Sequence, residues 1–280
     1  MKLFRKSAQT YESSRQVNDS PIRTSLMVLM GVGVVVVGLS LPYYLYDFQA
    51  FYPQVLAEAH GMIFDIAIIG ILIYWLNYRL EKRQRIRTYL DEIDDFRLWE
   101  SEESAFRTAG NIKRLNRHKI YDLNLADSHI MRTNLNYVRL VQANLNLANF
   151  SQSLMIGAVL EESRLNQTNF EGTNLNRASF RNAFANGANF KDAHLISADF
   201  ESAYLIKANF ENAILMEANL RGSDLSGASL KNCNLFKADL RQVAGLTKEQ
   251  LIEAQNIHRA KIDEHLLSEI QTDYPQLITR

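Results

Sequence analysis

A five-residue period constrains this chain more than any other feature. From residue 126 to residue 240 the chain divides into 23 consecutive units of five, and every fifth position from 130 to 240 is Leu, Phe, Ile or Met, except Ala185. The residue two places earlier is Ala, Ser, Thr or Cys in every unit except the one with Val138. A period of five fits neither a helix nor a plain strand, which repeat every 3.6 and two residues. The backbone must therefore turn a corner in every unit.

Each unit can form one side of a coil. The small and the large residue lie two apart, so both point to the same side of a short extended piece. Asn often stands just before the large residue, and we expect it to serve the corners, because it accepts turn conformations and bonds nearby backbone. Repeated corners close a coil, and successive coils stack through backbone hydrogen bonds. The sequence therefore predicts a β-solenoid over residues 119–245.

The spacing of the phenylalanines indicates four sides per coil. Phe occupies the large site at Phe150, Phe170, Phe190 and Phe210, and Asn precedes it each time. In-register stacking favours identical side chains in columns. A period of twenty therefore predicts an inward Phe ladder along one side of a stack of nearly six coils.

The repeats resemble those of the pentapeptide repeat family, whose motif is Ala-Asp/Asn-Leu-x-x, from about residue 120 to 245. The resemblance implies an all-β, right-handed quadrilateral β-solenoid with no shared catalytic residue. Some family members resemble DNA and inhibit topoisomerases, and others are effectors or membrane-associated proteins. The run AGNIKRLNRHKIYDLNL at 109–125 is similar to the lead-in of bacterial, membrane-linked members.

One unit, RNAFA at 181–185, departs from the pattern, with Ala185 at the large site and Phe184 in the outward position. Either the coil bulges and Phe184 turns inward, or Phe184 is exposed. We favour the inward shift, because exposing Phe beside an empty inward site carries two penalties.

Two apolar segments precede the repeats. Residues 26–46 hold no charge, and residues 62–78 hold only Asp65. About 20 apolar residues cross a bilayer as a helix, so we predict a two-helix transmembrane hairpin after a tail at 1–25. The competing interpretations are a signal peptide for the first segment, which lacks a cleavage site, and a buried core helix for the second.

The flanking charges predict the orientation. Residues 1–24 hold five basic and two acidic residues, residues 79–87 hold five basic residues against Glu81, and the loop at 47–61 holds no Lys or Arg. Positive charge favours the cytoplasmic side. We expect a multi-pass protein of the plasma (inner) membrane with both termini in the cytoplasm, in contact with membrane lipids.

Helices are expected on both sides of the solenoid. Residues 79–118 have apolar residues at helical spacing up to Trp99, and no Gly or Pro interrupts them before Gly110, so we expect an amphipathic helix continuous with the second span. It packs either on the first coil or on a second subunit. Residues 246–280 begin with a capping box at Thr247, and they form either a lid on the last coil or a dimer contact.

Composition and motifs give no sign of catalysis. The formal net charge is zero, which argues against nucleic-acid binding. The histidines have no metal-ligand spacing, no phosphate loop or nucleophile motif occurs, and Cys233 replaces a small residue of the repeat. We therefore expect no enzyme, no cofactor and no metal.

The outward residues differ between the sides. Beside the large sites from 155 to 235 stand Leu154, Ile156, His194, Ile196, Ile214, Met216 and Phe236. The Phe-ladder side has only Met131, and the side from 140 to 240 carries many charges. An apolar stripe of this kind suggests a surface for a partner or a second copy, unless the chain's own helices cover it.

These observations favour a membrane-tethered protein-binding or scaffolding module, oligomeric and with a protein partner of unknown identity. A two-helix pore or effector is the first alternative, with Asp65 as a candidate polar site in the membrane. A DNA-mimicking topoisomerase inhibitor is the second. The near balance of 11 basic and 12 acidic residues over 121–245 is unlike the charge of DNA.

Overall fold

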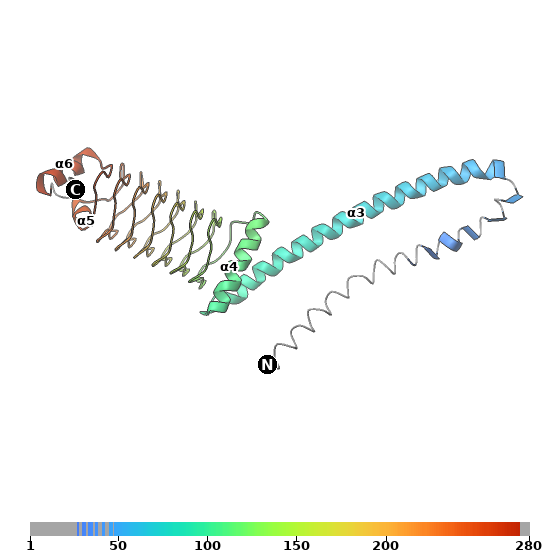
Figure 1. The fold of residues 1–280 in the computed structure, drawn as a ribbon, viewed down its shortest axis with the longest axis horizontal. Coiled ribbons are helices and arrows are strands. Elements are labelled where there is room, and N and C mark those ends of the chain that lie inside the picture. Colours follow the sequence, from blue (N-terminus) through green and yellow to red (C-terminus); the bar gives the residue numbers. More distant parts are fainter. Residues whose placement is uncertain are drawn as a thin grey trace, which may run out of the picture. The chain divides into compact units, whose positions relative to one another are not determined.

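The computed structural model describes residues 48–274 without interruption and only parts of the stretch from 27 to 46 (27, 30–31, 33–35, 37–38, 41–42 and 45–46). The described helices are α3 (Phe48–Phe96), α4 (Glu102–Arg117), α5 (Lys248–Ile252) and α6 (Glu264–Asp273), labelled in Figure 1. The chain divides into two compact units, Met1–Arg79 and Leu80–Arg280.

The first unit is described mainly through α3. The predicted tail at 1–25 lies outside the described residues, and the predicted first span at 26–46 is described only in part. The loop prediction for residues 47–61 is wrong from Phe48 onward, because α3 already begins there and contains Pro53. Hydropathy marks where apolar composition ends, and a helix continues beyond that limit wherever the backbone geometry allows it.

The predicted second span is helical, as expected, and its side chains are exposed in the chain by itself. Phe64, Ile69 and Ile71 are all more than half exposed. From Ala57 onward the helix is long and apolar enough to cross a membrane, with a mean hydropathy of 1.8 over its most apolar stretch. Asp65 lies well inside α3, because the helix begins at Phe48.

The helix predicted to continue to Gly110 ends earlier. α3 stops at Phe96, and α4 begins after Ser101, which forms a reciprocal capping box with Ser104. The Ser101 side chain accepts a hydrogen bond from the Ser104 N–H at 3.1 Å, which satisfies a donor that the first turn leaves free. Gly110 lies inside α4.

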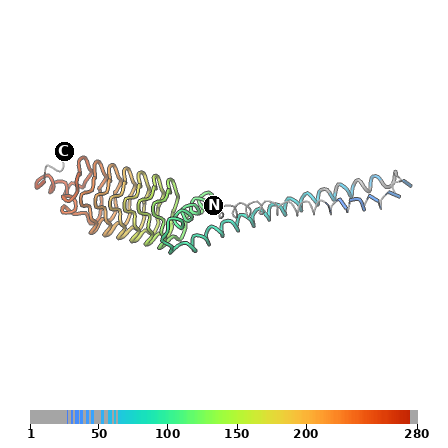
Figure 2. The backbone as a smooth tube through the Cα atoms, turned by 60° about the horizontal axis from the view of Figure 1, so that its bottom comes forward, coloured from blue at the N-terminus to red at the C-terminus, as the bar shows by residue number. Residues whose placement is uncertain are grey.

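The repeats form a four-sided solenoid. Parallel bridges connect residues twenty apart, from Asn124 with Asn144 to Asp224 with Ala244, and Figure 2 shows the coils stacked in register. Each corner places one residue at a positive φ, as at Gln152 (58°) and Gly157 (64°). That residue follows the large site by two, and it is often neither Gly nor Asn.

Asn serves the corners by bonding nearby backbone, as expected, but not by adopting the turn conformation itself. The Asn just before the large residue has an ordinary φ, and its side chain accepts a hydrogen bond from the N–H two residues later, as Asn149 does from Ser151 at 3.0 Å. It also bonds its counterparts in neighbouring coils: the Asn189 amide donates to Asn169 at 3.0 Å and the Asn209 amide to Asn189 at 3.2 Å. These side chains form ladders along the stack.

The interior columns follow the twenty-residue period. The rings of Phe150, Phe170, Phe190 and Phe210 are fully buried and stack in parallel with centroids 4.9–5.5 Å apart. This is the column that the spacing predicts. Such ring contacts add to the free energy gained by burying the rings.

The favoured prediction for residues 181–185 is wrong. The register is kept, Phe184 points outward with 42% of its surface exposed, and Ala185 is buried. The interior does not need a large residue there, because the rings of Phe180 and Phe190, on the flanking sides, meet edge to face at 5.6 Å. Outside, Phe184 stacks on Tyr204 at 4.9 Å.

Helices close both ends of the stack, as Figure 1 shows. At the first coil, Ile93, Ile112 and Leu115 join the same apolar cluster as Leu123, so the segment before the repeats packs on the solenoid. At the last coil, Thr247 caps α5 as predicted, and the cluster continues through Leu251, Ile257 and Ile270. The lid interpretation of residues 246–280 is confirmed for the part that the structure describes.

The stack continues further than the repeat motif does. After α5, bridges connect Asn234 with Asn256 and Asp239 with Lys261. The offset is 22 residues instead of 20, so α5 occupies one side and adds two residues to the coil. Because of this change of offset, the last partial coil does not follow the five-residue pattern of the sequence.

Candidate interaction surface

The outward residues of the solenoid form four walls on one backbone. We call the side with large sites from 135 to 235 the apolar wall, and the side with large sites from 140 to 240 the charged wall. On the apolar wall two outward columns run along the stack. One contains Leu154, Asn174, His194 and Ile214, which the bridges place in consecutive coils.

The predicted stripe on the apolar wall is interrupted. Leu154 and Ile156 are separated from the other apolar residues by Asn174 and Asn176 in the intervening coil. The Asn176 side chain accepts a hydrogen bond from the Ile196 N–H at 2.9 Å. The polar residue that interrupts the stripe therefore helps to hold the backbone of the next coil. Beyond it the structure brings together a set that we call the apolar patch: His194, Ile196, Ile214, Met216 and Phe236.

The apolar patch is partly exposed, with His194 and Ile196 exposed and Ile214, Met216 and Phe236 half-buried, and it continues into the last coil. Ile196 is 36% exposed, and Leu154, across the break, is 44% exposed. His258 extends the patch, because its ring stacks on Phe236 at 5.8 Å. His258 is not apparent from the five-residue pattern, since it follows the 22-residue offset. The chain's helices close the ends of the stack, and these exposures show that, among the described residues, nothing buries Ile196 or Leu154.

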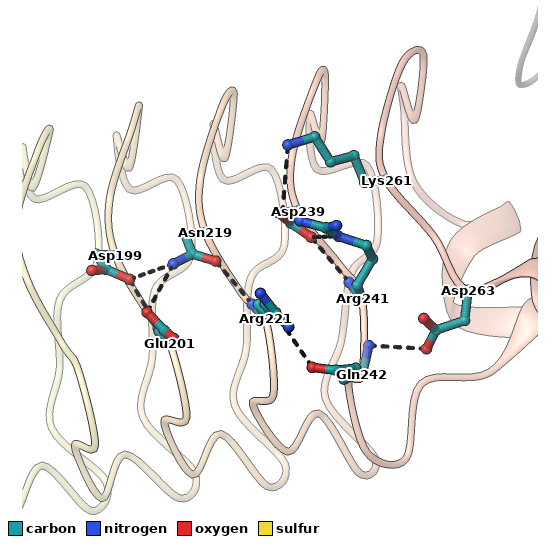
Figure 3. A network of polar contacts seen from close by, with 9 residues as sticks. All are labelled: Asp199, Glu201, Asn219, Arg221, Asp239, Arg241, Gln242, Lys261 and Asp263. Atoms are coloured by element: carbon teal, nitrogen blue, oxygen red, sulfur yellow. Dashed lines mark hydrogen bonds and ion pairs between the residues drawn. The ribbon is translucent and has the colours of Figure 1, made fainter.

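The charged wall is tied together by its own polar contacts. Figure 3 shows the network in the last coils, where the Asn219 amide donates to Asp199 at 2.9 Å and the Arg221 guanidinium donates to Gln242 at 3.0 Å. The Arg241 guanidinium donates to Asp239 at 2.8 Å, and Lys261 lies 3.6 Å from the same carboxylate. In these last coils the charged groups therefore bind one another.

Asp239 is the most strongly held acid of this network. Its hydrogen bond from Arg241, helped by the charges of Arg241 and Lys261, lowers its pKa from 3.8 to about 2, against an opposing contribution from burial. The carboxylate therefore stays ionised well below the pH at which an ordinary Asp is protonated.

The chemically reactive side chains of the solenoid are not assembled into a site. Cys233 is fully buried at a small inward position, where burial raises its pKa to about 12, so it fills space as the repeat predicts. His194 is exposed on the apolar wall. No cluster of three or more metal-ligating residues occurs in the described part of the chain.

The pair Phe184 and Tyr204 forms a second exposed aromatic surface, on the wall opposite the apolar wall. The two rings are 42% and 45% exposed. The twenty-residue spacing between them is visible in the sequence, but the expected inward turn of Phe184 concealed the pair.

The deciding comparison is with the family model of pentapeptide repeats, which matches eight copies in this chain, over residues 133–172, 153–192, 173–212 and 213–243. Residues 133–243 of the chain belong to the pentapeptide repeat family. The matched residues coincide with the coils whose bridges repeat every twenty residues, so the family motif and the four-sided solenoid are two descriptions of the same segment.

Several solved pentapeptide repeat structures are similar to this chain. Rfr23 from the cyanobacterium Cyanothece 51142 is 22% identical, with 56% of this chain and 99% of that chain covered and a TM-score of 0.25. QnrB1, a plasmid-mediated fluoroquinolone resistance protein, is 16% identical over 54% and 84%, with a TM-score of 0.27. HetL from Nostoc sp. strain PCC 7120, involved in heterocyst differentiation regulation, is 20% identical over 54% and 93%, with a TM-score of 0.19.

These similarities concern the solenoid fold alone. A comparison with curated protein sequences finds no match.

Proposed function

We propose that this pentapeptide repeat protein is a membrane-tethered scaffold that binds a protein partner through the apolar patch. The observation that carries the proposal is the contrast between two walls of one solenoid. In its last coils the charged wall satisfies its polar groups internally, whereas Ile196 and its neighbours present apolar surface to solvent. Burying such surface against a partner gains about 25 cal/mol per Å² of apolar area.

The membrane tether rests on α3. Its side chains between Phe64 and Leu76 are apolar and exposed, apart from Asp65. A helix that is apolar on every face needs an apolar environment, and a lipid bilayer supplies one. With the basic residues that follow from Arg79 to Arg87 on the cytoplasmic side, the solenoid faces the cytoplasm of a bacterial inner membrane.

Binding is tested with the full chain, tagged, crosslinked in membranes and purified in mild detergent. The Ile196→Lys/Met216→Lys variant places two charges in the apolar patch. The matched control, Ser151→Lys/Ser229→Lys, adds the same two charges on the Phe-ladder wall. We expect crosslinked partners to disappear with the patch variant and to remain with the control. Equal recovery of partners with all three proteins would show that the patch does not bind them.

The same variants test self-association, which is the alternative occupant of the patch. Light scattering of the purified full chain in detergent measures the subunit number. If a second copy covers the patch, the oligomer dissociates in the patch variant and persists in the control. An unchanged oligomer together with lost crosslinks assigns the patch to a different protein.

The orientation is tested by cysteine labelling in intact cells. Because Cys233 is the only cysteine, the Cys233→Ala variant provides a background without thiols. A cysteine introduced at Ser151 should react with a membrane-impermeant reagent only after the cells are opened. Labelling of intact cells would contradict a cytoplasmic solenoid.

A further inference from the structure

A basic groove lies where α4 meets the first coil of the solenoid. It has a volume of about 370 Å³ and is lined by Lys113, Asn116, Arg117, Tyr121, Asn136, Tyr137, Val138 and Arg139. Three of these residues are cationic and none is acidic. The volume falls within the range of small-molecule sites, about 300–1,000 Å³.

The positive side chains of the groove are not in direct contact with an acidic side chain among the described residues. Lys113 and Arg117 are four residues apart, which places them on the same face of α4, and Arg139 comes from the solenoid. The described part of the chain contains no ion pair of these three side chains at 4.0 Å or less. Basic residues near the end of a helix also offset its dipole, but this explanation does not reach Arg139, which belongs to a different element.

The Arg139 side chain is held by its surroundings. Its guanidinium carbon lies 5.1 Å from the centre of the Tyr121 ring. Its backbone is fixed by Asn116, whose amide group donates to the Arg139 carbonyl at 2.9 Å and accepts from the Arg139 N–H at 2.6 Å. A guanidinium with a fixed backbone and a ring beside it loses less freedom when it binds an anion.

One edge of the groove is formed by an aromatic ring that packs against the next coil. The Tyr137 ring lies directly against Gly157 of the next coil, where a Cβ atom would come within 2.8 Å of the ring. Gly157 itself has a φ of 64°. A glycine at this corner therefore allows Tyr137 to lie flat along the stack beside the basic residues.

We propose that this groove binds a phosphate-bearing ligand, either the headgroup of an anionic phospholipid or a soluble phosphate ester. The paired N–H donors of an arginine guanidinium match the oxygens of a phosphate group, and a lysine ammonium adds a point charge. The groove is separate from the apolar patch, so anion binding does not depend on the proposed scaffold function.

Calorimetry on the full chain in detergent tests the proposal, with inorganic pyrophosphate as one probe and short-chain phosphatidylglycerol below its micelle concentration as the other. Short-chain phosphatidylcholine and sodium chloride are the reference ligands. We expect binding of at least one probe that weakens with ionic strength. The Arg139→Gln and Lys113→Gln variants should each weaken it about tenfold, whereas Arg177→Gln, outside the groove, should leave it unchanged.

The two probes identify the source of the phosphate. Binding of phosphatidylglycerol without pyrophosphate assigns the groove to lipid, and the reverse result assigns it to a soluble ester. The Gly157→Ala variant provides a second approach, because it displaces Tyr137 while keeping every charge, and it should also weaken binding. Affinities that are equal in all variants, or no stronger than those of the reference ligands, would overturn the proposal.

Discussion

The interior columns and the outward walls of this solenoid are built from the same pentapeptides, yet they follow different rules. Inside, the large and small sites are buried along the whole stack, and Leu, Phe, Ala and Cys there differ mainly in volume. Outside, neighbouring walls carry apolar residues, an ion network or Asn ladders on the same backbone. Folding is therefore encoded mainly in two positions of each unit, with support from outward Asn side chains, and the other outward positions can vary to make surfaces that interact.

The largest expected effect is in the interior. Phe190→Ala removes a ring that stacks on Phe170 and Phe210, and we expect it to lower the free energy of unfolding by about 3–5 kcal/mol. Urea unfolding of the full chain in detergent, followed by circular dichroism, measures the loss. Phe190→Leu, which keeps most of the volume, should cost clearly less. A near-neutral Phe190→Ala would show that the columns do not bear the stability.

The second effect tests how the interior tolerates Ala185. Ala185→Leu restores the family pattern but overpacks a site beside Phe180 and Phe190, and should destabilise the chain by about 1–3 kcal/mol. Adding Phe180→Leu, which returns the volume, should recover part of that loss. If Ala185→Leu alone is stabilising, the interior has an unfilled space at this site and the volume argument fails.

A smaller effect is expected on the charged wall, and it depends on pH. The folded-state pKa of Asp239 is about 2 against an ordinary 3.8, so its contribution to stability is complete above 3.8 and is lost as the pH falls towards 2. Asp239→Asn should therefore show a shallower loss of stability over this range than the unaltered chain. Arg241→Gln removes the main cause of the pKa shift, so it should also make the loss of stability between pH 3.8 and 2 shallower. Identical dependences of stability on pH for all three proteins would contradict this prediction.

The smallest effect on stability is expected on the apolar wall. Ile196→Ser changes an outward side chain that is 36% exposed, and the free energy of unfolding should change by no more than about 0.5 kcal/mol. The same urea experiment measures it, with the inward Leu195→Ala as the matched contrast, at about 2–5 kcal/mol. A large loss with Ile196→Ser would mean that the patch supports the fold and is not free to bind.

The four-sided fold could be predicted because its signal is repeated more than twenty times and rests on volume and polarity alone. The Phe ladder and the Thr247 cap follow from spacing and from a local motif. The corner geometry could not be predicted in the same way, since Tyr137 and Leu147 occupy positive-φ positions that residue preference alone assigns to Gly or Asn. There the stacked backbone ladder outweighs a local cost of about 1–2 kcal/mol.

Features that depend on two distant elements were also missed. The break between α3 and α4 depends on the capping box at Ser101, which an uninterrupted helical pattern concealed. The basic groove needs Arg139 beside α4, and the link between His258 and Phe236 needs the 22-residue offset. The gap in the apolar stripe could have been predicted from the sequence, because Asn174 and Asn176 occupy the same two columns as the apolar residues.

The pairing of Asn116 with Arg139 has a consequence for how the protein behaves at high concentration. A stack of coils has an edge of unpaired peptide groups at each end, and such an edge can template the addition of another chain. The Asn116 side-chain amide meets both backbone groups of Arg139, as the peptide group of a preceding coil would. The Asn116 side chain thus takes the hydrogen bonds that a preceding coil would make with Arg139. The addition of another chain end to end is therefore blocked at that position.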